Sequence, residues 1–312
     1  MRYYGGRGLL LSASMPTALE TSIYRTLAYF AYFKYPLTSF EIWKWLLEPR
    51  QETSLAEVVQ TLSSSTWLSE RLESHQGFYA LEHVAEQRHD RHLRFLDAMR
   101  KYQKVERVIK LLGRLPWIDG IAVCNSLSWH HTNGESDIDL FIVAKPGRVW
   151  SARMLSTLPI MLLRQRPGEA KLDPMCLSFF STESAFDFAK LKIGSADPYL
   201  AYWCQSLVPV VSRGAWQARF QLANAWLREV LPNAAPVLRA SRFRSNAPLR
   251  WPWLPVSERL LKQFQIEKLP PAIRKLMNKD TRVVVNDQML KFHEQDSRDL
   301  IRYTLEGRMT RL

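Results

Sequence analysis

Residues 123–143 read VCNSLSWHHTNGESDIDLFIV, and they carry the strongest local signal in the chain. Apolar runs at 121–124 and 138–143, rich in branched residues, predict two buried strands joined by a polar loop. The second strand opens with Asp137-Ile138-Asp139. Because side chains alternate faces along a strand at ~3.3 Å per residue, we expect Asp137 and Asp139 on one face, roughly 6–7 Å apart at the backbone.

Two carboxylates on one face of an apolar strand repel each other unless a cation lies between them. Mg²⁺ prefers hard oxygen ligands and takes one or two protein carboxylates, with substrate phosphates and water completing its octahedron. We therefore predict that Asp137 and Asp139 bind Mg²⁺ or Mn²⁺. The alternative is that Asp137 is a loop acid or helix cap and that Asp139 pairs with an arginine.

Asn125 and Ser126 follow the first predicted strand, where the chain would turn into a helix or loop. Backbone amides at such a turn can bind phosphate oxygens, and Ser126 adds a hydroxyl. We predict that these two residues contact the phosphates of a nucleotide. A plain polar turn is the alternative.

This pattern resembles the DNA polymerase beta-type nucleotidyltransferase superfamily, whose smaller members include kanamycin nucleotidyltransferase and the minimal nucleotidyltransferases. The family signature is a Gly-Gly or Gly-Ser turn, a loop, and then Asp-apolar-Asp. Here Asn125-Ser126 is followed, after ten residues, by Asp137-Ile138-Asp139-Leu140. Asn125 replaces the first glycine, and asparagine is the residue that best tolerates a positive φ after glycine.

The resemblance implies a magnesium-dependent enzyme that moves a nucleoside monophosphate from a nucleoside triphosphate to a hydroxyl acceptor. The acceptor would be a small molecule, a protein or an RNA. It also implies a third carboxylate, which in the family acts as a general base or metal ligand on the next core strand. On the strand expected at 175–180, the positions facing the site are Cys176 and Ser178. Asp173 before it is the candidate third catalytic acid, Glu183 after it is a substitute, and the absence of any third acid stays open.

Three basic residues follow the acidic strand: Lys145, Arg148 and Arg153. In a nucleotide-binding site they would hold the triphosphate, and we take Lys145 and Arg148 as the candidate contacts. The alternative is that these side chains face solvent at the start of a helix.

The whole chain is predicted to be α+β, with a small mixed-sheet nucleotidyltransferase core between an N-terminal winged-helix-like domain and a C-terminal helical region. Three short helices followed by a hairpin arm at 77–81 give the element order of a winged helix-turn-helix. The predicted segments are a flexible extension at 1–18, the winged-helix-like domain at 19–84, the core at 85–185 with a leading helix at 85–115, and the helical region at 186–312.

Composition narrows the class of protein. The 312 residues are 46% hydrophobic and 23% charged, which excludes wholesale disorder. Three cysteines cannot form a disulfide framework, and none lies in a C-x-x-C pair, so no structural zinc site is expected. They fit a reducing compartment, and we expect the cytoplasm. No run approaches the ~18 apolar residues that a membrane span needs, so no membrane partner is expected.

The net charge is +13, and residues 237–312 hold 16 Lys and Arg against 8 Asp and Glu. This basic C-terminal region is either a solvated face or a surface that binds nucleic acid. The predicted recognition helix at 54–62 contains no Lys or Arg, which argues against DNA binding by the winged helix.

Other polar and aromatic residues have structural interpretations. His130 and His131 are expected to be solvated loop residues, with phosphate or metal binding as the alternative. His293, on a predicted helix with Asp296, is expected to be a cap or salt link. Three tryptophans are expected in the core, although aromatic rings can also stack on bases: Trp203, Trp216 and Trp226.

Two functions are compatible with these observations. One is the nucleotidyltransferase, which the retention of two mutually repelling acids favours. The other is a catalytically weak or inactive regulator that senses a nucleotide, which the missing third acid and the altered glycine favour.

Overall fold

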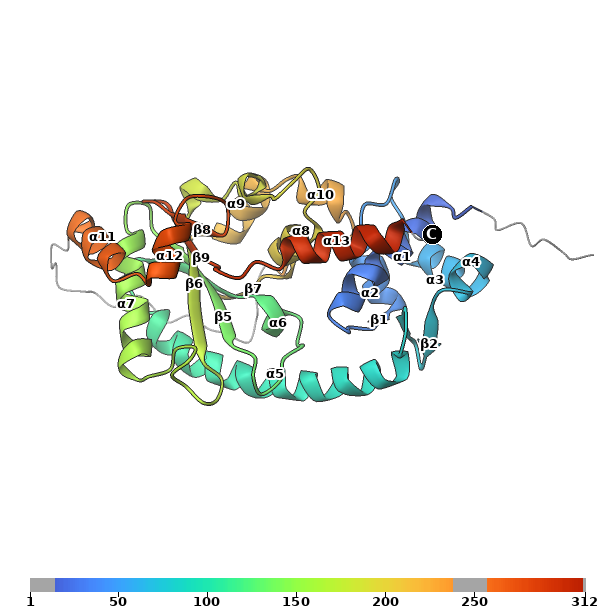
Figure 1. Ribbon diagram of the computed structural model, residues 1–312, viewed down its shortest axis with the longest axis horizontal. Helices are drawn as coiled ribbons and strands as arrows, with labels where there is room; N and C mark the ends of the chain where they lie inside the picture. The colour runs from blue at the N-terminus through green and yellow to red at the C-terminus, as the bar shows by residue number, and fades with distance from the viewer. Residues whose placement is uncertain (1–14, 238–256, 311–312) are drawn as a thin grey trace, which may run out of the picture.

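The computed structural model describes residues 15–237 and 257–310 (Figure 1). The first fourteen residues of the predicted extension lie outside this range, as does part of the basic C-terminal region. The described chain mixes helices with a six-stranded and a three-stranded sheet, so the α+β class is confirmed. None of its helices combines the length and apolarity that crossing a bilayer would require.

The N-terminal elements occur in the predicted order. They are α1 (Ala18–Tyr32), β1 (Leu37–Thr38), α2 (Ser39–Lys44), α3 (Leu55–Ser64), α4 (Thr66–Ser69), β2 (Glu73–His75) and β3 (Phe78–Ala80). A capping box, in which a Ser or Thr and a Glu bond each other's backbone, begins each of α1, α2 and α3. The three strands form a small antiparallel sheet in the order β1-β3-β2.

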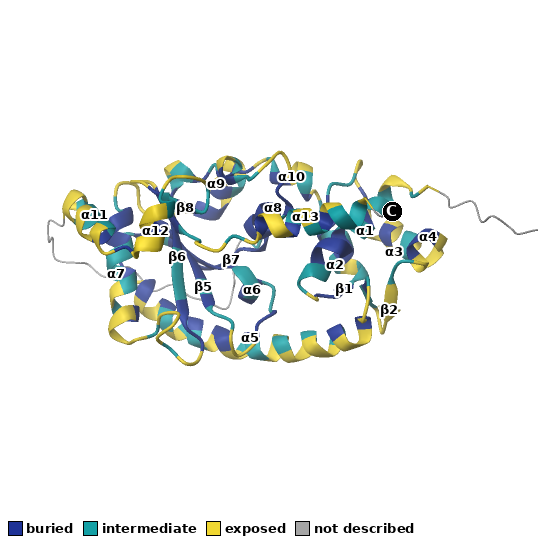
Figure 2. Ribbon diagram, in the orientation of Figure 1, coloured by how far each residue is buried: buried dark blue, intermediate teal, exposed yellow. Residues whose placement is uncertain are grey.

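Helix α5 (Val84–Leu112) runs from this N-terminal module, residues 15–83, to the large sheet (Figure 1). Its C-terminal half packs on the sheet through Tyr102, Val105 and Ile109, whereas Leu93 and Leu96 in its middle are exposed (Figure 2). At its N-terminal end Arg91 bonds Glu41 of α2 and lies over the ring of Tyr35. Helix α5 therefore connects the N-terminal module, which contains the small sheet, with the large sheet.

The large sheet has the order β7-β4-β5-β6-β9-β8. Its strands are β4 (Ile118–Val123), β5 (Ile138–Ala144), β6 (Met175–Thr182), β7 (Val208–Ser212), β8 (Val283–Val285) and β9 (Met289–Phe292). Only β5 and β6 pair in parallel, and a register shift interrupts this pair between Asp139 and Phe141. The three strands predicted at 121–124, 138–143 and 175–180 are confirmed in the centre of the sheet.

The prediction that 186–312 is helical was wrong in one respect, because β7, β8 and β9 come from this region and complete the sheet. The helices of the remaining chain are α6 (Asn125–Ser128), α7 (Val149–Leu162), α8 (Pro198–Ser206), α9 (Trp216–Ala223), α10 (Leu227–Val230), α11 (Glu258–Glu267), α12 (Pro271–Leu276) and α13 (Arg298–Met309).

Two buried clusters occupy the two faces of the sheet. One, under α5, α7 and α12, includes Ile138, Leu140 and Ile142 of β5. The other includes Phe141 and Val143 and continues through α8 into the core of the N-terminal module. Because Asp137 and Asp139 alternate with the first set, they belong to the second face, where α8 and α9 pack against Phe141.

Candidate metal and nucleotide site

Asp137 and Asp139 lie where β5 begins, as the sequence predicted. Both carboxyls have raised pKa values: burial raises that of Asp137, and burial together with the charge of Asp137 raises that of Asp139 to about 6. Within residues 15–237 and 257–310, no Lys or Arg forms an ion pair with either carboxylate, although Lys101 influences Asp137 at longer range. The alternative in which an arginine neutralises Asp139 is therefore not supported by the described residues.

The neighbours of Asp139 come from β4 and β6. The backbone N–H of Cys124 donates to the carbonyl of Asp139 at 3.1 Å, and Cys176 is its partner across the parallel pair. Burial, then the charge of Asp139, raises the pKa of the Cys176 thiol to about 12, so this thiol stays protonated and donates to the carboxylate. The position where the third carboxylate was sought thus holds a neutral side chain.

Asn125 has a φ of +54°, a left-handed conformation that asparagine tolerates better than other non-glycine residues. This turn ends β4 and begins the short helix α6. The side-chain oxygen of Asn125 accepts a hydrogen bond from Nε1 of Trp203 at 2.9 Å, and a hydrogen bond from Asn125 counteracts the rise in the pKa of Asp139. Asn125 and Ser126 are therefore brought next to the carboxylate pair.

Asp173 instead forms ion pairs with Arg100 and Lys101 of α5. Nζ of Lys101, a completely buried residue, contacts its Oδ1 at 2.6 Å, and Arg100 bonds both of its oxygens. Burial alone would raise the pKa of Asp173, but these two cations hold it below its usual range. The structure therefore gives Asp173 two cationic partners and does not support it as the third acid of the pair.

Glu183, the other substitute, pairs with Arg219 just beyond the end of β6. More generally, no group of three or more His, Cys, Asp or Glu side chains that could hold a metal occurs among the described residues. The carboxylate pair remains as a two-acid site.

The structure places Lys145 and Arg148 away from the carboxylate pair, which corrects the predicted triphosphate contacts. Strand β5 starts at the two acids and ends before Lys145, so about six residues at ~3.3 Å each put roughly 20 Å between Asp139 and Lys145. Arg148 lies over the ring of Trp117 and near Glu258. The third basic residue, Arg153, donates to Gln265 of α11 at 2.7 Å.

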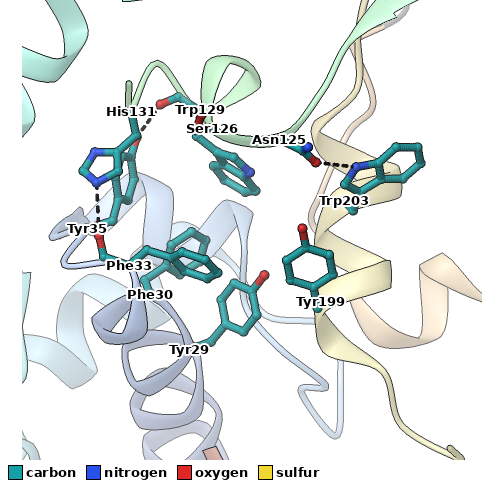
Figure 3. Close-up of a pocket in the computed structure, with 10 residues that line it drawn as sticks. All are labelled: Tyr29, Phe30, Phe33, Tyr35, Asn125, Ser126, Trp129, His131, Tyr199 and Trp203. Carbon is teal, nitrogen blue, oxygen red and sulfur yellow. Dashed lines mark hydrogen bonds between the residues drawn. The ribbon is translucent and has the colours of Figure 1, made fainter. Parts of the chain in front are cut away.

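The sequence analysis missed an aromatic pocket beside Asn125 and Ser126 (Figure 3). Tyr29, Phe30, Phe33 and Tyr35, from α1 and the turn after it, form one wall. A second wall contains Trp129 and His131 from the loop after α6. A third contains Tyr199 and Trp203 from α8. No motif could have revealed it, because its walls come from three separate stretches of the sequence, residues 29–35, 125–131 and 199–203, and meet only through packing.

Two histidines, His131 and His293, lie in surroundings that differ from those predicted. His131 is buried rather than solvated, and its Nε2 donates to the carbonyl of Phe33 at 3.0 Å. Burial and the charge of Arg94 lower its pKa to about 4, so it is neutral near pH 7. His293 follows β9 rather than lying on a helix, and it contacts Ser178 Oγ at 3.2 Å.

The tryptophans and the basic region have mainly structural contacts. Trp203 and Trp216 are buried in the core as predicted, and Trp226 is packed beside it. In the described part of the C-terminal region, five cations pair with carboxylates: Lys262, Arg282, Arg298, Arg302 and Arg308.

Comparison with known proteins does not extend these observations. No protein-family model matches the sequence, and no curated protein or solved structure matches it.

Proposed function

We propose that this protein binds a nucleoside triphosphate with a divalent cation and transfers the nucleoside monophosphate to a hydroxyl acceptor. The observation that carries the proposal is the carboxylate pair on one face of β5. Asp137 repels Asp139 in a half-buried setting, and neither has an ion-pair partner among the described residues. Such an arrangement favours binding of a cation from outside.

The two carboxylates fit Mg²⁺ or Mn²⁺. They supply hard oxygen ligands, and Mg²⁺ accepts one or two protein carboxylates when phosphates and water fill its other positions. Asp137 and Asp139 would hold the ion. When bound, it supplies positive charge that neutralises the triphosphate and the charge developing during transfer.

In the proposed reaction the acceptor oxygen forms a bond to the α-phosphorus. The bond from that phosphorus to the bridging oxygen breaks, pyrophosphate leaves with the electron pair, and the hydroxyl proton passes to solvent water. The chain's own residues bind and orient the substrates, with Asn125 and Ser126 as candidate phosphate contacts. Their placement next to Asp139 supports that role.

The N-terminal module is proposed to be a winged-helix-like domain. Its element order and the β1-β3-β2 sheet support this, and its core merges with α8 and one face of the large sheet. We propose that it completes the substrate site rather than binding DNA, because α3 contains no Lys or Arg.

A second candidate is a nucleotide-binding regulator without transferase activity. The neutral Cys176 beside Asp139 favours it, because no third carboxylate is available there as a base. Loss of a general base typically costs about 10²–10⁴-fold in rate.

Binding is tested with ATP, GTP, CTP and UTP by calorimetry, with and without Mg²⁺. We expect Mg²⁺-dependent binding of at least one nucleotide and a loss of roughly 10–100-fold or more in Asp137→Asn. Glu135→Gln is the matched control, because this exposed acid lies two residues away in the same loop. Equal binding by the wild type and Asp137→Asn would show that the pair is not the cation site.

Pyrophosphate release then separates the two candidates. A transferase releases pyrophosphate in the presence of its acceptor and loses this activity in Asp139→Asn. A regulator binds the nucleotide with the same Mg²⁺ dependence and leaves it intact with every hydroxyl acceptor offered.

A further inference from the structure

The aromatic pocket has the form of a small binding site. Its volume is about 110 Å³, and seven of its ten lining residues are Tyr, Phe or Trp. No Lys, Arg, Asp or Glu lines it. Figure 3 shows that α1 and α8 contribute facing walls, with the turn at Asn125 and Ser126 between them. The pocket therefore suits an uncharged, apolar group.

The pocket also contains polar atoms without partners. Tyr29 is 4% exposed, yet neither its hydroxyl nor that of Tyr199 forms a hydrogen bond with another described residue. Both tyrosines line the pocket, so their hydroxyls stay available to an occupant that carries hydrogen-bonding atoms. In Figure 3 both hydroxyls point toward the side of the pocket where Asn125 lies. A ligand that filled this space would bring hydrogen-bonding atoms to them.

Size sets the kind of group that fits. An apolar cavity of about 150 Å³ binds benzene in another protein, so a partly open pocket somewhat smaller than this admits one six-membered ring rather than two fused rings. Aromatic walls favour a flat ring, which gains from stacked and edge-to-face contacts.

We propose that this pocket binds a single, planar, uncharged ring that carries hydrogen-bonding atoms on its edge. Tyr29 and Tyr199 bond the polar edge, and the aromatic walls from α1, the loop after α6 and α8 hold the faces. No motif in the sequence assigns this site, and it does not depend on the carboxylate pair.

Binding of a ring by the pocket does not depend on the proposed function. Only the identity of the molecule that carries the ring rests on the proposed function. Asn125 lines the pocket and also bonds Asp139, so the ring lies one residue away from the carboxylate pair. The ring is then either the pyrimidine base of the bound nucleotide or a ring of the hydroxyl acceptor. Both sources have the same chemistry at this pocket.

Ring binding is tested without Mg²⁺, with phenol and uridine as probes and tryptophan fluorescence as the signal. Trp129 and Trp203 line the pocket, so a bound ring changes their emission. We expect saturable binding of at least one probe, and about fivefold weaker binding in Tyr29→Phe and in Tyr199→Phe, each of which removes one neutral hydrogen bond. Tyr24→Phe is the control, because this tyrosine also lies on α1 but packs against Trp67 outside the pocket.

Two arms distinguish the sources of the ring. If the ring is a nucleobase, uridine competes with UTP, and Tyr29→Phe reduces the preference for UTP over ATP. If the ring belongs to the acceptor, phenol binds together with Mg²⁺ and ATP without competition. Either result supports the pocket.

The proposal is overturned if neither probe gives saturable binding, or if both Tyr→Phe variants bind as tightly as the wild type. The thermal midpoint of each variant shows that it is folded. Phenol binding is repeated in Asp137→Asn, where it persists even if the carboxylate pair binds no metal. Failure of the pocket and failure of the proposed transferase are thus separate results.

Discussion

Asp139 is a carboxyl whose surroundings in the folded chain oppose its negative charge. Its carboxyl lies among apolar residues, with Asp137 as a neighbouring charge and a neutral thiol on the next strand. Hydrogen bonds from Asn125 and Cys176 offset only part of the cost, because the pKa still rises from 3.8 to about 6. Charging this carboxyl therefore costs more in the metal-free folded protein than in the unfolded chain.

This pKa shift predicts a specific pH dependence. Well below pH 4 the carboxyl is protonated in both the folded and the unfolded state, whereas well above pH 6 it is charged in both. The free energy of unfolding of the metal-free protein therefore falls by roughly 2–3 kcal/mol between these limits because of Asp139.

Asp139→Asn should remove this penalty. At pH 7.5 without metal, the variant should unfold at higher urea concentration than the wild type, and the difference should vanish near pH 4. Added Mg²⁺ should raise the stability of the wild type at pH 7.5 but not that of the variant. A variant that is less stable than the wild type at pH 7.5 would show that the charge is compensated in the folded state.

At the residue scale, the features that could be predicted from the sequence are those set by residues adjacent in the chain. The shared face of Asp137 and Asp139 follows from strand alternation, and the left-handed Asn125 follows from the turn that its position requires. The position of Lys145 relative to the acids could not be predicted in this way. Lys145 is close to them in sequence, but β5 runs between them and carries Lys145 to its other end.

Among the elements, β4 is fixed by a close contact at Gly120. A Cβ added there would lie 2.2 Å from Nε1 of Trp216, a buried side chain that donates to the carbonyl of Val211. Gly120→Ala should therefore lower the free energy of unfolding by about 1–3 kcal/mol.

Gly134→Ala is the matched control for this substitution. Gly134 lies in the loop before β5, and nothing lies within 4 Å of a Cβ built there. This variant should stay within about 0.5 kcal/mol of the wild type. Urea unfolding measures both, and equal stability of the two variants would contradict the contact.

The three strands that the sequence analysis did not predict have an alternating pattern that is either interrupted or too short to recognise. Strand β7 contains Pro209, which interrupts the pattern and is tolerated because β7 is an edge strand. Strands β8 and β9 have only three and four residues, too few for a periodic signal. The central strands were predicted because they are long and buried on both faces.

At the scale of the molecule, Arg298 holds the C-terminal helix in place. Its buried guanidinium bonds Asp296, Asp197 before α8 and the carbonyl of Leu191. Helix α13, which starts at this residue, then packs along α1 (Figure 1). The last helix of the described chain thus covers the first.

Arg298→Met should be strongly destabilising, by about 3–5 kcal/mol, because it leaves the buried Asp197 without its cation. Arg308→Met, near the end of the same helix, removes only an exposed contact with Glu82 and should cost about 1 kcal/mol or less. Urea midpoints compare the two. Similar losses in both would mean that Arg298 does not hold α13 in place.

The order of strands in the large sheet has a consequence for synthesis of the chain. Strand β6 leaves the ribosome more than one hundred residues before β9, the strand that covers its outer edge. At 5–20 residues per second, the backbone beside Phe179 and Phe180 stays unpaired for roughly 5–20 s. During that interval the nascent chain presents an apolar edge to its surroundings, so chaperone capture and self-association compete with folding until the last tenth of the chain emerges.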